Sequence, residues 1–258
     1  MRVLILAAAL VLSGFTLAQT ASNPAPISWG QYTIRQEAGL LRIIRSDRTQ
    51  VEIRGGRFEV KQVELTGRAP VELWINEISG PNTTAYFFTQ EQGFRNLLIY
   101  RGRTAGVLEV RDVNNDRRAE IIVGTDVFAD FGGLPREVYP RLTYILAWDG
   151  VRYVDATARF PTLGFRTLSY YREALRDALI QRDDVNARSA ALGYYGRGLI
   201  TGQAEEAKKW LMANTPQEIR RWLLDLEGEA IRAIYADFAC RVTVSYSRNL
   251  PPRPVCNG

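Results

Sequence analysis

The sequence of 258 residues contains no histidine. Histidine is the general base of serine and cysteine triads and a frequent zinc ligand, so its absence excludes catalysis by those triads and zinc sites built on imidazole. The chemistry that remains uses carboxylates, metals that prefer oxygen ligands, or binding alone. Lysine is scarce as well, because only Lys61, Lys208 and Lys209 occur and arginine carries nearly all of the positive charge.

The formal net charge is +5 at pH 7. Acidic and basic residues are interspersed, and no run of four cations occurs, which is the pattern of a solvated surface on an arginine-rich protein. An anion or nucleic-acid binder is an alternative that rests on charge alone. We therefore expect no nucleic-acid partner.

Residues 1–18 have the pattern of a secretory signal peptide. Arg2 precedes an apolar run from Val3 to Leu12, and small residues lead to a cleavage site after Ala18, with a cut after Ala21 as a competitor. The apolar run is shorter than the roughly 20 residues that span a bilayer, although a retained anchor is the alternative. We expect a periplasmic or secreted protein that has no transmembrane segment after cleavage.

Cysteine is nearly absent, and the two that occur, Cys240 and Cys256, both lie in the part that would be exported. An oxidising compartment favours a bridge between such an isolated pair. We predict a Cys240–Cys256 disulfide that tethers a proline-rich tail, and two free thiols are the alternative.

Hydrophobic residues make up 46% of the chain and aromatic residues 10%, which indicates a globular protein. Short β-branched and aromatic segments separated by glycine-containing turns predict strands in the first part of the chain. The expected strands are 31–35, 40–45, 50–54, 57–65, 72–78, 84–89, 96–101, 107–113, 119–125, 142–148 and 152–156.

Helical spacing of apolar residues replaces the strand pattern from about Leu163. We expect helices over 168–179, near 185–195, over 204–213 and from Pro216 onward. Thr215 and Glu218 would cap the last helix. Its core-facing stripe would consist of Ile219, Trp222, Leu223, Leu226, Ala230 and Ile234.

The expected fold class is α+β, with an N-terminal antiparallel β-sheet domain followed by a C-terminal helical domain. The expected boundaries are 1–18 for the signal peptide, 19–27 for a linker, 28–160 for the β-rich domain, 161–246 for the helical domain and 247–258 for the disulfide-tethered tail.

A weak internal repeat lies within the β-rich part. Residues 63–75 align with residues 111–123, and in each copy a polar turn leads to a strand that opens with a glutamate, Glu72 or Glu120. The offset between the copies is 48 residues (120 − 72), which is in the range of propeller blades.

The turn of the second copy carries oxygen donors at alternating positions, and calcium takes six to eight such ligands. We predict that one calcium ion binds there, with the carbonyl of Arg118 among its ligands. The side-chain ligands would be Asp112, Asn114, Asp116 and Glu120. A solvated turn is the alternative, because Asp and Asn favour turns for reasons of their own backbone bonding.

This loop resembles the calcium-binding turn of FG-GAP and VCBS-type repeats of integrin-like β-propellers, matching it at the first, third, fifth and ninth positions. Two departures are Arg117 at the sixth position, where glycine is usual, and Glu120 in place of a final aspartate. The resemblance covers about Phe58 to Thr157 in two copies, or in three copies if Tyr32 to Gly55 is a degenerate copy. Since a closed propeller needs about four blades, it implies an incomplete, propeller-like domain that binds or scaffolds.

We therefore expect a secreted or envelope-associated non-enzymatic binding or scaffolding protein, with a protein or a polysaccharide of the cell envelope as its partner. The alternative is a glycan hydrolase that uses two carboxylates as acid and base. Its candidate residues are Asp126, Asp130 and Glu137, in the loop around Gly132 and Gly133. That loop is otherwise a solvated connection.

Overall fold

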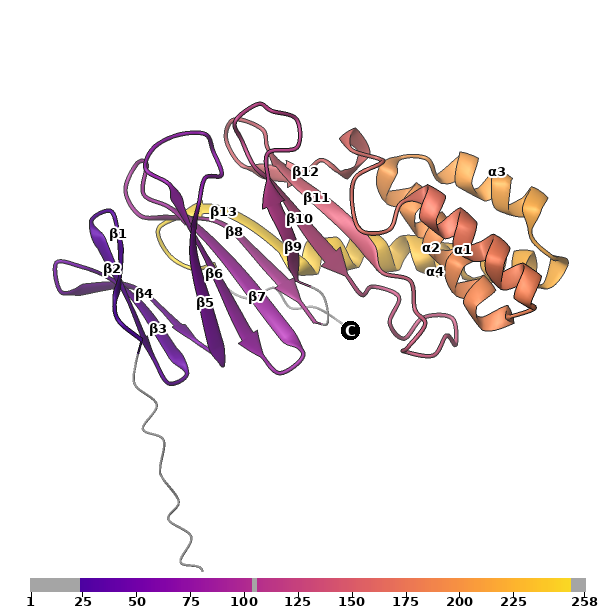
Figure 1. Cartoon of the computed structure of the whole chain (residues 1–258), viewed down its shortest axis with the longest axis horizontal. Helices are drawn as coiled ribbons and strands as arrows, with labels where there is room; N and C mark the ends of the chain where they lie inside the picture. Colours follow the sequence, from indigo (N-terminus) through magenta and orange to yellow (C-terminus); the bar gives the residue numbers. More distant parts are fainter. Residues whose placement is uncertain (1–23, 104–105, 252–258) are drawn as a thin grey trace, which may run out of the picture.

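The computed structural model describes residues 24–103 and 106–251, and it shows three antiparallel sheets side by side with the helices gathered at one end (Figure 1). Each sheet contains four strands that follow one another in the chain and pair with their neighbours. The first sheet consists of β1 (Ile27–Trp29), β2 (Tyr32–Glu37), β3 (Leu40–Arg45) and β4 (Arg48–Arg54).

The second sheet lies between the other two and gains a fifth strand from the C-terminal part of the chain. Its consecutive strands are β5 (Arg57–Val63), β6 (Glu72–Ser79), β7 (Asn82–Thr89) and β8 (Arg95–Gly102), with β13 (Val242–Ser247) paired to β8. The third sheet consists of β9 (Val107–Arg111), β10 (Glu120–Thr125), β11 (Leu142–Trp148) and β12 (Tyr153–Asp155).

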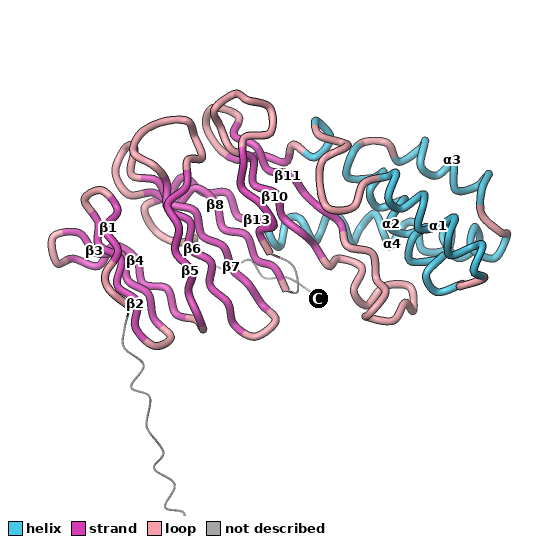
Figure 2. Tube along the Cα trace, in the orientation of Figure 1, coloured by secondary structure: helices cyan, strands magenta, loops and turns pink. Residues whose placement is uncertain are grey.

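The helices follow the third sheet (Figure 2). A short 3₁₀ helix, Thr157–Arg159, precedes α1 (Leu168–Gln181), α2 (Asp184–Thr201), α3 (Ala204–Asn214) and α4 (Gln217–Arg241). None of these helices in the described residues is long and apolar enough to cross a membrane. The fold is thus α+β, with sheets first and helices in the C-terminal part, as the sequence predicts.

Separate apolar layers fill the spaces between neighbouring units. Trp29 and Ile43 of the first sheet pack with Leu73 and Ile75 of the second. Phe87 and Leu98 on the other face of the second sheet pack with residues of the third sheet, such as Ile121. Because the second sheet is covered on both faces, five successive residues of β8, Asn96 to Tyr100, are buried, whereas buried and exposed residues alternate near the end of β4 in the first sheet.

The two ends of this row of sheets differ, because the first sheet exposes a polar face and the third sheet is covered by helices. The free face of the first sheet is polar: Arg42 forms ion pairs with Glu37 at 2.9 Å and with Glu52 at 3.1 Å. Phe238 of α4 and Ile200 of α2 pack against the core of the third sheet. A row of repeated units needs such terminal caps, because each unit buries its apolar face only against a neighbour.

Besides shifts in the bounds of several elements, three sequence predictions differ from the structure. Residues 242–246 were expected to be helical, but Val242, Thr243 and Val244 pair with β8, as suits β-branched residues on a sheet edge. The short strand β1 was not expected. The third difference concerns Thr215, whose hydroxyl does not cap α4 but donates to the carbonyl of Leu211 at 2.7 Å, so it closes α3 instead.

The apolar stripe predicted on the last helix is confirmed. Ile219, Leu223, Ala230 and Ile234 are buried, and Trp222 and Leu226 pack against the same core. Residues 1–23 and 252–258 lie outside the described residues, and with them lie the predicted signal peptide and most of the predicted tail.

Candidate functional site

The two sequence repeats form the same local structure. In the first copy, the backbone N–H of Leu65 donates to Glu72 Oε2 at 2.8 Å. In the second copy, the N–H of Val113 donates to Glu120 Oε2 at 2.9 Å. The glutamate that opens each second strand therefore folds back to the residue seven positions earlier, and the equivalent residues are again 48 positions apart.

Both glutamates are buried, with exposed fractions of 0% for Glu72 and 2% for Glu120. Burial raises the pKa of each carboxyl above its ordinary value, and the bonds from Leu65 and Val113 oppose that rise. The charges of Asp116 and Asp112 raise the pKa of Glu120 further. A buried carboxylate needs such partners, because an unpaired one would be strongly destabilising.

The two turns also contact each other. The N–H of Ala119 donates to the carbonyl of Leu65 at 2.9 Å, and the Tyr153 hydroxyl donates to the carbonyl of Ala119 at 3.0 Å. A Cβ added to Gly67 would lie 2.3 Å from the carbonyl oxygen of Arg117, so only glycine permits this approach. The second and third sheets are therefore joined through their repeat turns as well as through their apolar layer.

In the second copy, Asp112 organises the turn. Its Oδ1 accepts from the N–H groups of Asn114 at 3.3 Å and Asp116 at 3.2 Å, and its Oδ2 accepts from the N–H of Arg117 at 2.8 Å. Arg117 has a φ of 66°, in the left-handed region where glycine is favoured. The backbone at this sixth position of the turn thus adopts the left-handed conformation with an arginine in place of a glycine.

The side chains of Asn114, Asp116 and Glu120 converge. The Asn114 amide nitrogen lies 3.2 Å from Asp116 Oδ2 and 3.3 Å from Glu120 Oε1. The other oxygen of Asp116 accepts from the N–H of Arg118 at 2.9 Å. Each of the two carboxylates therefore keeps one oxygen for the backbone and turns the other toward the same amide group.

Asp112 does not join this point, because its two oxygens bond to backbone N–H groups of the turn. Within residues 24–103 and 106–251, no three acidic or cysteine side chains meet as a group that could hold a metal. The side chains that could contact one metal ion at this point are thus two carboxylates and one amide, which is a smaller set than the sequence predicts.

The carboxylates considered for a hydrolase are separated in the structure. Asp126 is buried and pairs with Arg241, and Asp130 is exposed and pairs with Arg136 at 2.8 Å. Glu137 lines a groove beside α1 and α2. An acid and base pair requires two carboxyls that face one substrate, and Asp126 and Asp130 instead face arginines.

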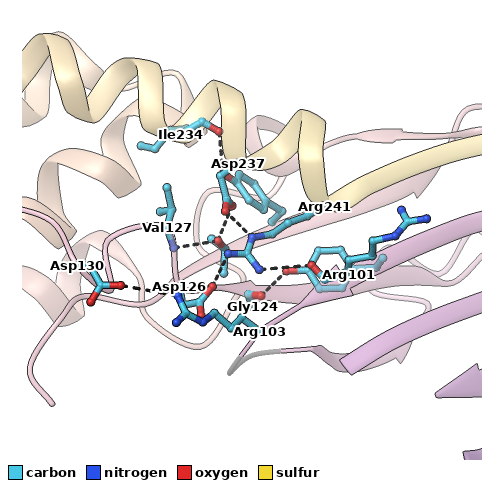
Figure 3. A network of polar contacts seen from close by, with 12 residues as sticks. Arg101, Arg103, Gly124, Asp126, Val127, Asp130, Ile234, Asp237 and Arg241 are labelled. Atoms are coloured by element: carbon cyan, nitrogen blue, oxygen red, sulfur yellow. Dashed lines mark hydrogen bonds and ion pairs between the residues drawn. The ribbon is translucent and has the colours of Figure 1, made fainter. Parts of the chain in front are cut away.

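A buried network of charged side chains, which no sequence motif predicted, lies at the end of α4 (Figure 3). Arg241 forms ion pairs with Asp126 and with Asp237, and it donates to the carbonyl of Arg101 at 3.3 Å. Asp237 also accepts from the Thr125 hydroxyl at 2.5 Å. An aspartate four residues before an arginine near a helix end is the sequence signal that could have indicated an ion pair here.

Burial has opposite effects on the two sides of this network. It raises the pKa of Asp237, against the charge of Arg241. For Arg241 burial acts to lower the pKa, but the charges of Asp237 and Asp126 outweigh it and the pKa stays above its ordinary value. One cation and two anions thus share a site that joins the second sheet, the third sheet and α4.

Cys240 lies next to this network in the last turn of α4. Cys256 lies outside the described residues, so the Cys240–Cys256 bridge stays a prediction.

Comparisons with known proteins add no relative: no family model, no curated protein and no solved structure matches this chain.

Proposed function

We propose that this chain is a non-enzymatic binding or scaffolding protein of the cell envelope, whose β part is stabilised by one calcium ion at the turn of the third sheet. The observation that carries the proposal is the repeated bond from a turn N–H to a buried glutamate, Glu72 in one copy and Glu120 in the next. It supports a row of repeated sheet units, which offers a large rigid surface for partners.

The donors at the second turn suit calcium. Asp116 and Glu120 turn one oxygen each toward the Asn114 amide, where the partial positive charge of the NH₂ group lies between two negative charges. A half-turn of the Asn114 amide would break the bond that its oxygen accepts from the N–H of Asp116 at 2.9 Å and would present that oxygen there instead. Three side-chain oxygens could then meet one cation, whose charge would offset the lost bond. The carbonyl of Arg118 and water would complete the shell.

The first copy lacks this donor set, since Arg68 stands where the second copy has Asp116. Both carboxylate oxygens of its glutamate accept hydrogen bonds from the protein, because Glu72 accepts from the Thr66 hydroxyl at 2.8 Å in addition to the N–H of Leu65. The proposal therefore assigns calcium to one turn and leaves the other as a purely structural counterpart.

Thermal unfolding with and without calcium tests the ion. Binding to the folded chain alone should stabilise it by about 2.7 kcal/mol when free calcium is a hundredfold above its dissociation constant. The melting temperature should thus rise in calcium and fall in chelator at matched ionic strength. Asp116→Asn should remove most of this response, since it deletes a charge while its remaining oxygen can still accept from Arg118.

Glu109→Gln is the matched control, because Glu109 is an exposed carboxylate on β9 whose ion pair with Arg111 lies at the surface. This variant should keep the full calcium response. If the unmodified protein melts at the same temperature in calcium and in chelator, the turn binds no ion and the calcium part of the proposal is wrong.

A separate experiment tests the binding role. The purified protein, immobilised and exposed to solubilised envelope fractions with and without calcium, should retain a reproducible protein or glycan. Turnover of an envelope glycan by the purified protein would instead favour the hydrolase alternative.

A further inference from the structure

A groove of about 450 Å³ lies between the segment that connects β10 to β11 and the helices α1 and α2. This volume is in the range of small-molecule sites, which run from about 300 to 1,000 Å³. We propose that the groove binds a neutral saccharide. The inference deepens the proposed binding function by naming a ligand class, and it uses a site distant in sequence from the calcium turn.

The walls of the groove are held in place by hydrogen bonds from the helices. The Ser189 hydroxyl on α2 donates to the carbonyl of Val138, and the Tyr171 hydroxyl on α1 donates to the carbonyl of Arg141. Both donors are buried residues. The segment that carries Glu137 and Arg141 is therefore fixed before any ligand arrives, and a preformed site loses less entropy on binding.

An exposed aromatic ring stands in the groove. Tyr170 is 44% exposed although it lies beside the buried Tyr171, whose ring meets it edge-on at a centroid distance of 5.3 Å. The guanidinium of Arg166 lies 5.3 Å from the centre of the Tyr170 ring. These two neighbours hold the ring, which can then offer a flat apolar surface with a polar tip to a ligand.

Charged groups of both signs line the same groove without pairing. Arg141 and Arg166 are the cations, Glu137 and Asp177 are acids, and none of the four forms an ion pair with another described residue. Glu137, Arg141 and Asp177 are exposed, so a ligand in the groove can reach their charged groups.

A neutral saccharide matches this combination better than other ligands do. Its hydroxyl groups both donate and accept, so they can bond carboxylates and guanidinium groups together, and its ring C–H face can lie on an aromatic ring. A simple anion would gain from Arg141 and Arg166 but would be repelled by Glu137 and Asp177. The mixed charges therefore favour a polyol.

The test uses calorimetric titration of the purified protein with the soluble tetramer of N-acetylglucosamine, and in parallel with the tetramer of galacturonic acid as an anionic probe. The neutral tetramer should bind. Tyr170→Ala should weaken that binding about tenfold or more, which corresponds to about 1.4 kcal/mol. Asp177→Asn should weaken it as well, through loss of a charged acceptor.

Tyr235→Ala is the matched control, because Tyr235 is a 72% exposed tyrosine on α4 that does not line this groove. It should bind the neutral tetramer as the unmodified protein does. Since Tyr170 and Asp177 are both exposed, their variants should melt like the unmodified protein, which separates lost binding from lost folding.

No binding of the neutral tetramer at millimolar concentration, or equal binding by Tyr170→Ala, would overturn the saccharide inference. Binding of the galacturonate tetramer alone would overturn it too and make the ligand an anion. If calcium raises the melting temperature but no saccharide binds, the calcium site is supported and the saccharide inference is wrong. If the saccharide binds but calcium leaves the melting temperature unchanged, the saccharide inference is supported and the calcium site is wrong.

Discussion

Arg241→Met should be among the most destabilising single substitutions in this protein, with an expected loss of about 3–5 kcal/mol in the free energy of unfolding. The side chain of Arg241 is 14% exposed, and those of Asp126 and Asp237 are 1% and 9% exposed. Methionine would fill much of the same space but would leave two buried carboxylates without their cation. Urea denaturation at neutral pH measures the loss.

The pH dependence of this variant has a defined sign. Burial already raises the pKa of Asp237 in the folded protein, and loss of the Arg241 charge should raise it further above the unfolded value. Between these two pKa values the folded protein binds more protons than the unfolded chain. The contribution of Asp237 to the stability of the variant should therefore fall as the pH rises through this interval. The gap to the unmodified protein should therefore be larger at pH 7 than at pH 4.5.

Two further variants test the cause. Adding Asp126→Asn and Asp237→Asn to Arg241→Met should recover part of the lost stability, because neutral amides tolerate burial better than carboxylates that have lost the charge of Arg241. Arg221→Met, an exposed arginine on the same helix, should change stability by about 0.5 kcal/mol or less. Equal losses in the Arg241 and Arg221 variants would contradict a buried ion network.

Arg197→Leu should be the second strongly destabilising substitution, with an expected loss of about 2–4 kcal/mol. Arg197 is fully buried, and burial lowers its pKa to about 10. Its guanidinium donates to three carbonyls, those of Thr143 at 2.8 Å, Pro161 at 3.2 Å and Leu163. Leucine would leave these carbonyls buried without donors, which outweighs the benefit of removing a buried charge.

Arg197→Leu should also loosen the backbone segment whose carbonyls Arg197 contacts. Since Pro161 and Leu163 lie in the segment that leads from the third sheet to α1, amide hydrogen exchange should become faster around residues 157–166 in the Arg197 variant. Arg176→Leu, an exposed arginine of α1, is the control and should leave both exchange and stability nearly unchanged. Unchanged exchange in the Arg197 variant would show that this segment is held by packing alone.

Most of the fold could be predicted from sequence because local pattern and tertiary structure agree. The strand over Leu40–Arg45 and the strand over Leu142–Trp148 have the expected bounds, since apolar periodicity and flanking turns mark both of their ends. β1 has only three residues, and no periodicity can be recognised over that length. β13 follows a helix without any glycine or proline, so no turn signal separates them.

The candidate site could be predicted in part. The sequence places oxygen donors at alternating positions of the second turn, and the structure brings three of these side chains, Asn114, Asp116 and Glu120, together there. The sequence could not show that Asp112 serves the backbone of its own turn, because spacing does not tell which partner a carboxylate has. Nor could it show the groove beside α1, which is formed by segments from two parts of the chain.

The pairing of β13 with β8 has a consequence for how the chain folds. Arg101 donates to Thr243 at 2.8 Å across 142 residues of sequence, so the middle sheet is complete only after the four helices have been made. Until then the apolar strand β8 is an open edge, which can pair with other chains. Contacts this far apart slow folding, and a protein synthesised without residues 242–247 should aggregate at concentrations where the whole chain stays dispersed.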